Sequence, residues 1–353
     1  MLRALSLALL SACAIPGVDS GPRRPHIVVI LADDLGYSEL GSYGQKKIKT
    51  PHLDRLATQG MRFMRNYCGN AVCAPSRCVF ITGKHPGNAF VRNNGEVKPE
   101  GQRPIPKAEQ TIAELLRSHG YGTGAFGKWG LGFPGSEGDP INQGFDRFFG
   151  YNCQRHAHSY YPNYLWSNLK RVPLNNNPPV PGHASFAKGA DPADPRSYDI
   201  FKGQDYAPDR INEQALAFLR KNHDKPFFLY LPLSSPHTPI VPSKPWQGKS
   251  DIGKYGDFLM ETDWVVGQVL QALDRHRLAK DTIVIFATDN GCSPAAKIPA
   301  LVAKGHKPNA DWRGHKADIF EGGHRVPFLV RWPGKVAAGS TSGQTICTAD
   351  LFA

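Results

Sequence analysis

The chain has 353 residues, of which 41% are hydrophobic and 20% charged, a composition that is ordinary for a globular protein with a sizeable core. Its 36 glycines and 30 prolines argue against a compact helical bundle and indicate long, structured loops. The formal net charge of +12 favours anionic partners. Because the chain has no Lys/Arg run, no zinc-finger spacing and no aromatic RNA-binding pattern, we predict no nucleic-acid partner.

The N-terminus has the pattern of an export signal. Arg3 precedes an apolar stretch from Ala4 to Ile15, which is too short to span a bilayer comfortably. We therefore predict a signal peptide over residues 1–20 and a periplasmic or extracellular protein. Residues 10–13 (LSAC) also resemble a bacterial lipoprotein box, which would lipidate Cys13 and provide the one membrane attachment we expect. Ordinary cleavage between residues 14 and 20 is the open alternative.

Strand and helix patterns alternate along the rest of the chain, with apolar β-branched runs for strands and helical spacing between them. In chain order we predict a strand at 26–32, helices at 50–60, 75–82 and 108–119, a strand at 123–126, loops over 133–207, a helix at 208–223, a strand at 226–231, a helix at 255–275, a strand at 282–287 and a last strand at 326–332. This alternation predicts an α/β fold with a large, mostly parallel sheet and helices on both faces.

Charged and polar side chains follow four of the predicted strands. They are Asp33 and Asp34, Lys128, His237, and Asp289 and Asn290. Open parallel sheets place their functional groups beyond the carboxyl ends of the strands. The sequence therefore predicts a functional site at this edge of the sheet.

Asp33, Asp34, Asp289 and Asn290 all offer oxygen ligands, which suit Ca²⁺ or Mg²⁺ rather than zinc. Adjacent aspartates at the end of an apolar strand would repel each other unless a cation neutralised them. A solvated turn at 33–34 and an Asx turn at 289–291 are the simpler alternatives.

The stretch Cys73–Lys84 (CAPSRCVFITGK) resembles the signature of type I, formylglycine-dependent sulfatases, the arylsulfatase-like family of the alkaline phosphatase superfamily. A small buried cysteine is the usual interpretation of a lone cysteine, but further motifs occur in the family's order. They are DDLGY at 33–37, CAPSR at 73–77, GKWGLG at 127–132, SPHTP at 235–239, TDNG at 288–291 and RGHKADIFEGGHRVP at 313–327. The resemblance extends from about Pro25 to the end of the chain and predicts a catalytic domain over 25–353.

The resemblance implies hydrolysis of sulfate esters. A formylglycine-generating maturation enzyme, which reads Pro75 and Arg77, would oxidise Cys73 to an aldehyde, whose hydrate attacks sulfur. It further implies that Cys73 joins Asp33, Asp34, Asp289 and Asn290 as a metal ligand. The metal is usually Ca²⁺ in this family, with Mg²⁺ as the alternative.

The remaining catalytic roles are also carried over from the family. Arg77 would hold the hydrated aldehyde, and Lys128 and Lys316 would bind the sulfate oxygens where negative charge develops. His237 would act as the general acid toward the leaving alcohol, because the unperturbed pKa of histidine lies near neutrality. Taken alone, each of these lysines would be interpreted as a solvated surface group.

Two features depart from the family's pattern. Many relatives read GKWHLG, with a histidine thought to help regenerate the aldehyde, where this chain has Gly130. We hypothesise that His156 or His158 enters the site as a substrate contact or a replacement base; surface histidines in a loop are the alternative. Family members also continue past the region of Ala353 into a smaller domain, so we expect the C-terminal subdomain to be missing.

The expected substrate is a sulfated carbohydrate, with aryl sulfates also accepted. The positive charge suits a sulfated polyanion, and the aromatic residues Tyr160, Tyr161, Tyr164 and Trp166 suit stacking on sugar faces. The alternatives are a phosphonate or phosphodiester hydrolase of the same superfamily and a non-catalytic pseudo-sulfatase that binds sulfated glycans. If Cys13 is lost or lipidated and Cys73 is modified, five of the seven cysteines remain, which leaves one or two disulfides open.

Overall fold

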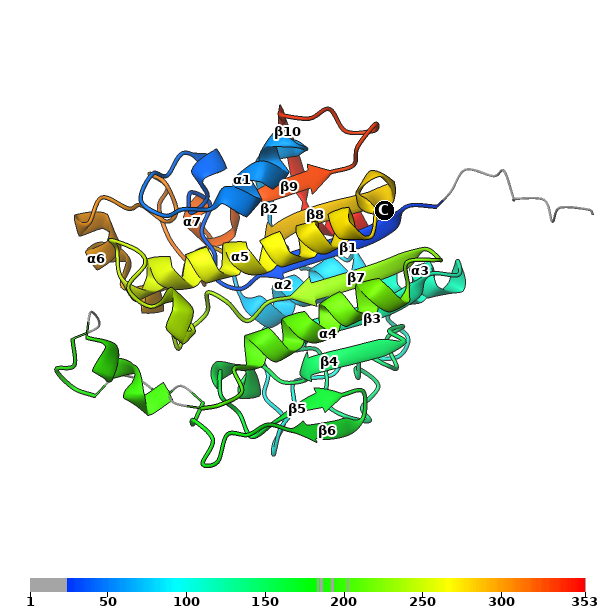
Figure 1. Cartoon of the computed structure of the whole chain (residues 1–353). Helices are drawn as coiled ribbons and strands as arrows, with labels where there is room; N and C mark the ends of the chain where they lie inside the picture. Colours follow the sequence, from blue (N-terminus) through cyan, green and yellow to red (C-terminus); the bar gives the residue numbers. More distant parts are fainter. Residues whose placement is uncertain (1–23, 183, 185–186, 192–193, 202, 353) are drawn as a thin grey trace, which may run out of the picture.

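A ten-stranded mixed sheet organises the molecule (Figure 1). The structure, a computed structural model, describes residues 24–352 except 183, 185, 186, 192, 193 and 202. The predicted signal peptide and lipoprotein box, including Cys13, lie outside these residues. The strands are β1 (His26–Ala32), β2 (Met61–Tyr67), β3 (Gly122–Lys128), β4 (Arg147–Tyr151), β5 (Tyr164–Ser167), β6 (Lys170–Pro173), β7 (Phe227–Pro232), β8 (Thr282–Thr288), β9 (Phe328–Arg331) and β10 (Ser340–Cys347).

The strand order is β10-β2-β9-β8-β1-β7-β3-β4-β5-β6. The five central strands, from β8 to β4, are all parallel to one another, and β10 is parallel to β2. The other four neighbouring pairs are antiparallel. Because β1 pairs with β8 up to Ala32–Thr288 and with β7 up to Leu31–Pro232, the carboxyl ends of these three strands lie together.

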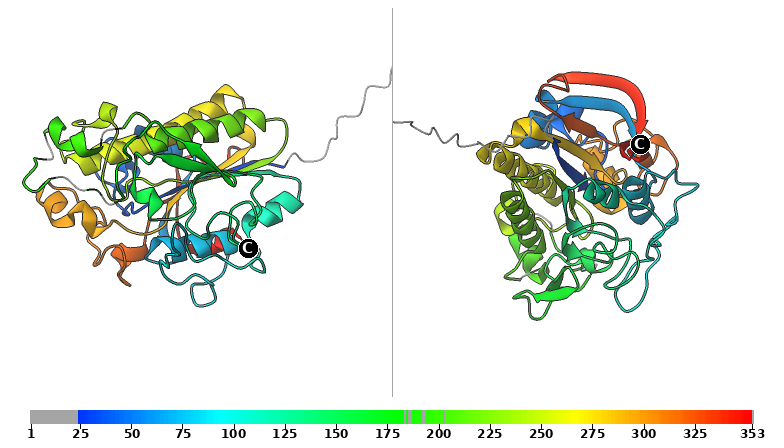
Figure 2. Two further views of the ribbon diagram at one scale, coloured as in Figure 1. Left: turned by 90° about the horizontal axis from the view of Figure 1, so that it is seen from below. Right: turned by 90° about the vertical axis from the view of Figure 1, so that its right-hand side faces the viewer.

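Helices cover both faces of the sheet. The main helices are α1 (Pro51–Thr58), α2 (Cys73–Thr82), α3 (Ile112–Ser118), α4 (Ala207–Lys221), α5 (Lys254–Arg275), α6 (Ile298–Ala303) and α7 (Glu321–His324). Successive β1 side chains point to opposite faces: Val28 and Ile30 pack with α1, α4 and α5, whereas Val29 and Leu31 pack with α2 and α3. Figure 2 shows α4 and α5 on one side of the sheet and α2 and α3 on the other. The predicted α/β fold is confirmed.

Three predictions about individual elements are wrong. Residues 133–207 were expected to form loops, but they contain β4, β5 and β6, which extend one end of the sheet. Strand β9 is not the last strand, because β10 follows it and forms the edge of the sheet opposite β6. Helix α3 begins at Ile112 rather than near Ala108, since Thr111 and Glu114 form a capping box that fixes its start.

The six described cysteines all carry free thiols, including Cys73 and Cys78 in α2. Among the described residues, no helix has both the length and the apolar character that crossing a membrane requires.

Candidate active site

The structure brings the predicted catalytic and metal-binding residues together at the carboxyl edge of the central strands. We call them the strand-end cluster: Asp33 and Asp34 after β1, Cys73 and Arg77 on α2, Lys128 at the end of β3, His237 after β7, Asp289 and Asn290 after β8, and Lys316 between α6 and α7. The backbone fixes this arrangement, because Asp33 N–H donates to Ser235 O and Asp289 N–H to Ala32 O, at 3.0 and 3.1 Å. Asp34 adopts a left-handed conformation (φ 66°) that turns the chain at the end of β1.

Two fully buried cations pair with the carboxylates of this cluster. Lys128 Nζ lies 2.6 Å from Asp33 Oδ2. Arg77 donates from Nε and Nη2 to Asp289 Oδ2, at 3.0 and 2.7 Å, and its Nη2 lies 3.4 Å from Asp33. Burial opposes ionisation of Asp33, but Lys128 and other neighbouring cations hold its pKa well below the usual range. Burial and the nearby Asp33 raise the pKa of Asp289 to about 7.

Cys73 is the first residue of α2, and its thiol lies between a carboxylate and an ammonium group. Its Sγ is 3.6 Å from Asp33 Oδ1 and 3.3 Å from Lys316 Nζ. Lys316 also contacts Asp34 Oδ1 at 2.7 Å. Burial raises the pKa of the Cys73 thiol to about 12, despite the opposing charges of Lys316 and Lys128. An unmodified Cys73 is therefore protonated near neutral pH and is a poor nucleophile.

The donor set fits a hard cation. Asn290 Nδ2 donates to Asp34 Oδ1 at 2.7 Å, whereas Asn290 Oδ1 is buried without a hydrogen-bond partner. Ligand atoms of Asp33, Asp34, Cys73 and His237 all lie within 4.8 Å of one another. A buried amide oxygen without a donor beside several carboxylates is the environment that Ca²⁺ or Mg²⁺ satisfies.

His237 lies at the outer side of the cluster. Its Nε2 is 3.5 Å from Asp34 Oδ2, and its Nδ1 is 2.5 Å from Thr238 O. Burial and the nearby Lys128 lower its pKa well below the usual value, so the neutral imidazole predominates without an added anion. Asp33 and Lys128 are fully buried, but the side chains of His237 and Lys316 are 7% and 15% exposed. The cluster is therefore open to solvent on the side of His237 and Lys316.

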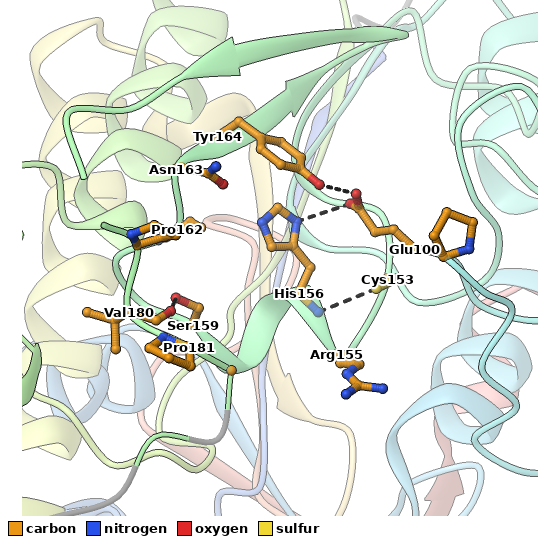
Figure 3. A pocket seen from close by; sticks show the side chains of 13 residues that line it. Glu100, Cys153, Arg155, His156, Ser159, Pro162, Asn163, Tyr164, Val180 and Pro181 are labelled. Carbon is orange, nitrogen blue, oxygen red and sulfur yellow. Dashed lines mark hydrogen bonds and ion pairs between the residues drawn. The ribbon is translucent and has the colours of Figure 1, made fainter. Parts of the chain in front are cut away.

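The two histidines of the 153–161 segment have different surroundings. The His158 ring stacks on the His237 ring, with centroids 4.6 Å apart and planes inclined by 5°. His156 instead faces away toward Glu100, with its Nδ1 3.1 Å from Glu100 Oε1 (Figure 3). The structure thus brings His158, but not His156, into contact with a residue of the strand-end cluster.

Gln154 occupies the space beside Gly130. Gly130 has a φ of +78°, and a Cβ added there would lie 2.9 Å from Gln154 Nε2 and 3.0 Å from its Cγ. A side chain at position 130 would therefore be strained and would displace Gln154. The sequence alone revealed that position 130 lacks the histidine of many relatives. It contained no signal that Gln154, 24 residues later, fills the space beside Gly130.

The sequence analysis also missed two supporting residues. The Tyr160 hydroxyl donates to Ser234 O and His237 O, at 2.5 and 3.0 Å, which holds the loop that carries His237. Tyr160 is only 1% exposed, so it does not stack on a sugar from this position. Glu100 accepts hydrogen bonds from Tyr164 and Trp166. The only sequence signal for either role was the density of aromatic residues between 160 and 166.

Comparison with known proteins assigns the family. Residues 25–353 match the family model named Sulfatase. The chain belongs to the sulfatase family. It is 32% identical to the steryl-sulfatase of Mus musculus, over 100% of this chain and 64% of that protein. It is 35% identical to the N-acetylgalactosamine-6-sulfatase of Rattus norvegicus, over 99% of this chain and 64% of that protein. The chain thus spans a little under two thirds of the length of these curated relatives.

A solved structure shows the same fold. The crystal structure of Ps i-CgsB in complex with k-i-k-neocarrahexaose superposes with a TM-score of 0.77 at 27% sequence identity, and the match covers 94% of this chain and 70% of that one. The predicted resemblance to type I sulfatases is confirmed. Members of the family use a modified cysteine and a metal, and this chain has a buried acidic, cysteine and histidine cluster of that kind.

The buried Lys128–Asp33 pair predicts a large effect on stability. In chelator-treated protein, we expect Lys128→Met to lower the free energy of unfolding by about 3 kcal/mol, because it leaves a buried carboxylate without its closest cation. Urea denaturation measures this loss. Lys84→Met is the matched control, since Lys84 forms a similarly short pair with Glu109 (2.5 Å) but is itself 44% exposed, so its loss should cost less than about 1 kcal/mol. Equal losses in the two variants would contradict the electrostatic interpretation.

Proposed function

We propose that this chain hydrolyses sulfate esters of sulfated carbohydrates, with aryl sulfates as artificial substrates. The observation that supports this most is the position of Cys73, at the first turn of α2, between Lys316 and Asp33 and inside a cluster rich in buried cations. The similar proteins point to the same class of substrate, because one is an N-acetylgalactosamine-6-sulfatase and Ps i-CgsB binds k-i-k-neocarrahexaose.

In this proposal, residue 73 acts after oxidation to formylglycine, whose hydrate supplies an oxygen nucleophile for attack on sulfur. A protonated thiol with a pKa near 12 is unsuited to that task. The whole pentapeptide 73–77 is buried in the folded chain. A maturation enzyme that reads Pro75 and Arg77 must therefore reach this segment before the chain has folded.

We assign the metal site to Asp33, Asp34, Asp289, Asn290 and residue 73, with Ca²⁺ as the expected ion and Mg²⁺ as the alternative. The bound cation would supply positive charge that lowers the pKa of a coordinated hydroxyl. Asn290 Oδ1 has no other partner in the described part of the chain, so it is available as a ligand.

The remaining side chains bind and orient the ester. Lys128 and Lys316 present ammonium groups on two sides of the cluster, where they can hold sulfate oxygens as charge develops. Arg77 holds Asp289 and Asp33 in place, and its charge also acts on residue 73, whose hydroxyls it would help to orient. His237, at the exposed side, would give a proton to the leaving oxygen once the negative charge of a bound ester favours its protonated form, and the stacked His158 fixes the plane of its ring.

The decisive experiment combines modification with turnover. The protein should be produced together with a formylglycine-generating enzyme, and mass spectrometry should show the peptide that contains residue 73 as the aldehyde. We expect sulfate release from N-acetylgalactosamine 6-sulfate and from 4-nitrophenyl sulfate, and none above background from Cys73→Ala. Cys347→Ala, which changes a half-buried thiol outside the cluster, should keep both activities.

Two outcomes would replace the proposal. Faster cleavage of a phosphodiester than of a sulfate ester with the same leaving group would indicate the phosphodiester hydrolase. An unmodified thiol without turnover, but with binding of sulfated glycan, would indicate the non-catalytic binder.

Metal binding gives a second prediction. After chelation, Ca²⁺ at about 100 times its Kd should raise the free energy of unfolding by about 2.7 kcal/mol, because the ion binds only the folded chain. Thermal or urea unfolding at matched ionic strength measures this gain. Asn290→Ala should need a higher Ca²⁺ concentration for the same gain, whereas the exposed Asn93→Ala should not. A Ca²⁺ response that is identical in the two variants would remove Asn290 from the site.

The role of His237 predicts a dependence on the leaving group. His237→Ala should lower kcat for a sugar sulfate by about 10²–10⁴-fold, since an alkoxide leaves poorly without a proton. The loss should be much smaller for 4-nitrophenyl sulfate, whose phenolate leaves unprotonated. His85→Ala, at an exposed position outside the cluster, serves as the control. Equal losses on the two substrates would show that His237 is not the general acid.

A further inference from the structure

A cavity of about 440 Å³ adjoins the 3₁₀ turn His156–His158, with His156 in its wall. We call it the Glu100 pocket. Figure 3 shows that Glu100, His156 and Tyr164 meet on one side of it, while Asn163, Val180 and Pro181 lie on the other. Its volume is in the range of small-ligand sites in proteins. None of the residues that line it belongs to the strand-end cluster.

The polar side of this pocket is held rigidly by one carboxylate. Glu100 accepts hydrogen bonds from Tyr164 and from Trp166, the latter at 2.7 Å, and pairs with His156 at 3.1 Å. Burial alone would raise the pKa of Glu100, but these contacts lower it to about 2. With Nδ1 directed at Glu100, the Nε2 atom of His156 remains for a further hydrogen bond.

The pocket and the proposed catalytic histidine share one short turn of chain. His156 and His158 are the ends of the 3₁₀ turn His156–His158, which spans ~6 Å at a rise of about 2 Å per residue. His156 lines the pocket, and the His158 ring stacks on His237. Because the cluster is open to solvent on the side of His237, a ligand that extends from there past this turn meets the Glu100 pocket.

We propose that the Glu100 pocket binds the sugar unit next to the sulfated one in an oligosaccharide. This inference rests on the proposed function, and it adds a second binding site that a small aryl sulfate does not reach. The walls combine apolar carbon surfaces, from Val180 and the prolines at 162, 179 and 181, with the polar groups of Asn163 and His156. Such a mixture suits a sugar ring, which carries C–H faces and hydroxyl groups at once.

The charge of the pocket agrees with this ligand. The Glu100 carboxylate is directed at His156, Tyr164 and Trp166, and the Arg171 guanidinium lies 3.7 Å from it. These partners offset the negative charge of Glu100, so its repulsion of an anionic glycan is reduced. The exposed Arg155 also lines the pocket, and its pair with Glu96 (3.3 Å) is solvent-exposed and therefore weak, so its charge remains available to an anionic ligand. The pocket therefore admits sugars that carry acidic groups as well as neutral ones.

Binding to a variant without turnover tests this proposal. Cys73→Ala protein should bind a chondroitin 6-sulfate tetrasaccharide at least about tenfold more tightly than N-acetylgalactosamine 6-sulfate, equivalent to about 1.4 kcal/mol, measured by calorimetry. Adding Pro181→Trp, an exposed position where a large ring fills the pocket, should reduce this ratio to near one. Adding Pro333→Trp, an exposed proline far along the chain, should leave the ratio unchanged.

A second, smaller substitution tests the pocket even if Pro181→Trp prevents folding. Asn163→Ala, which removes one exposed amide from the pocket, should reduce the ratio by a smaller factor of about five, since a single hydrogen bond contributes about 1 kcal/mol. Equal affinity for the two ligands, or a ratio that survives both variants, would overturn the proposal. Sulfate release by the mature enzyme is measured separately, so a failure of the proposed hydrolysis and a failure of this pocket give different results.

Discussion

The site depends on one electrostatic constraint, the neutralisation of buried carboxylates that the ends of β1 and β8 bring together. Three cations oppose three carboxylates in the strand-end cluster: Arg77, Lys128 and Lys316 against Asp33, Asp34 and Asp289. The formal charges of these six side chains sum to zero. A divalent cation bound in the cluster would therefore leave a net positive charge that is poorly solvated because the site is buried. An anionic group would neutralise that excess, and under the proposed function a sulfate ester would supply it next to residue 73. In this scheme, metal binding and anion binding support each other.

The burial of the cluster also determines which side of it is accessible to a ligand. The acidic residues and Lys128 lie beneath the surface, whereas His237 and Lys316 are partly exposed. Under the proposed function, an ester would therefore enter with its sulfate inward and its alcohol beside His237. The remainder of a glycan would then lie along the 3₁₀ turn His156–His158, so this short turn would distinguish long substrates from short ones.

The sequence predicted this site better than it predicted the sheet. Asp33, Lys128 and Asp289 follow buried parallel strands, and parallel strands bring such residues to one edge whatever their order in the chain. Strands β4 to β6 were missed because Arg147–Tyr151 is short and lies among prolines and glycines, and because β5 and β6 form an edge hairpin. The Glu100 network was beyond prediction, since Glu100 and Trp166 meet only through tertiary packing.

The Gly130–Gln154 contact bears on how the catalytic cycle would close. A side chain at position 130 would have to displace Gln154, and a glutamine amide cannot transfer a proton near neutral pH. Under the proposed function, the base that restores the aldehyde would therefore come from another element. An imidazole that has given its proton to the leaving oxygen is itself a base at the same position, so His237 would satisfy both demands in turn. The stacked His158 keeps that ring in one orientation between the two steps, a support that a lone histidine would lack.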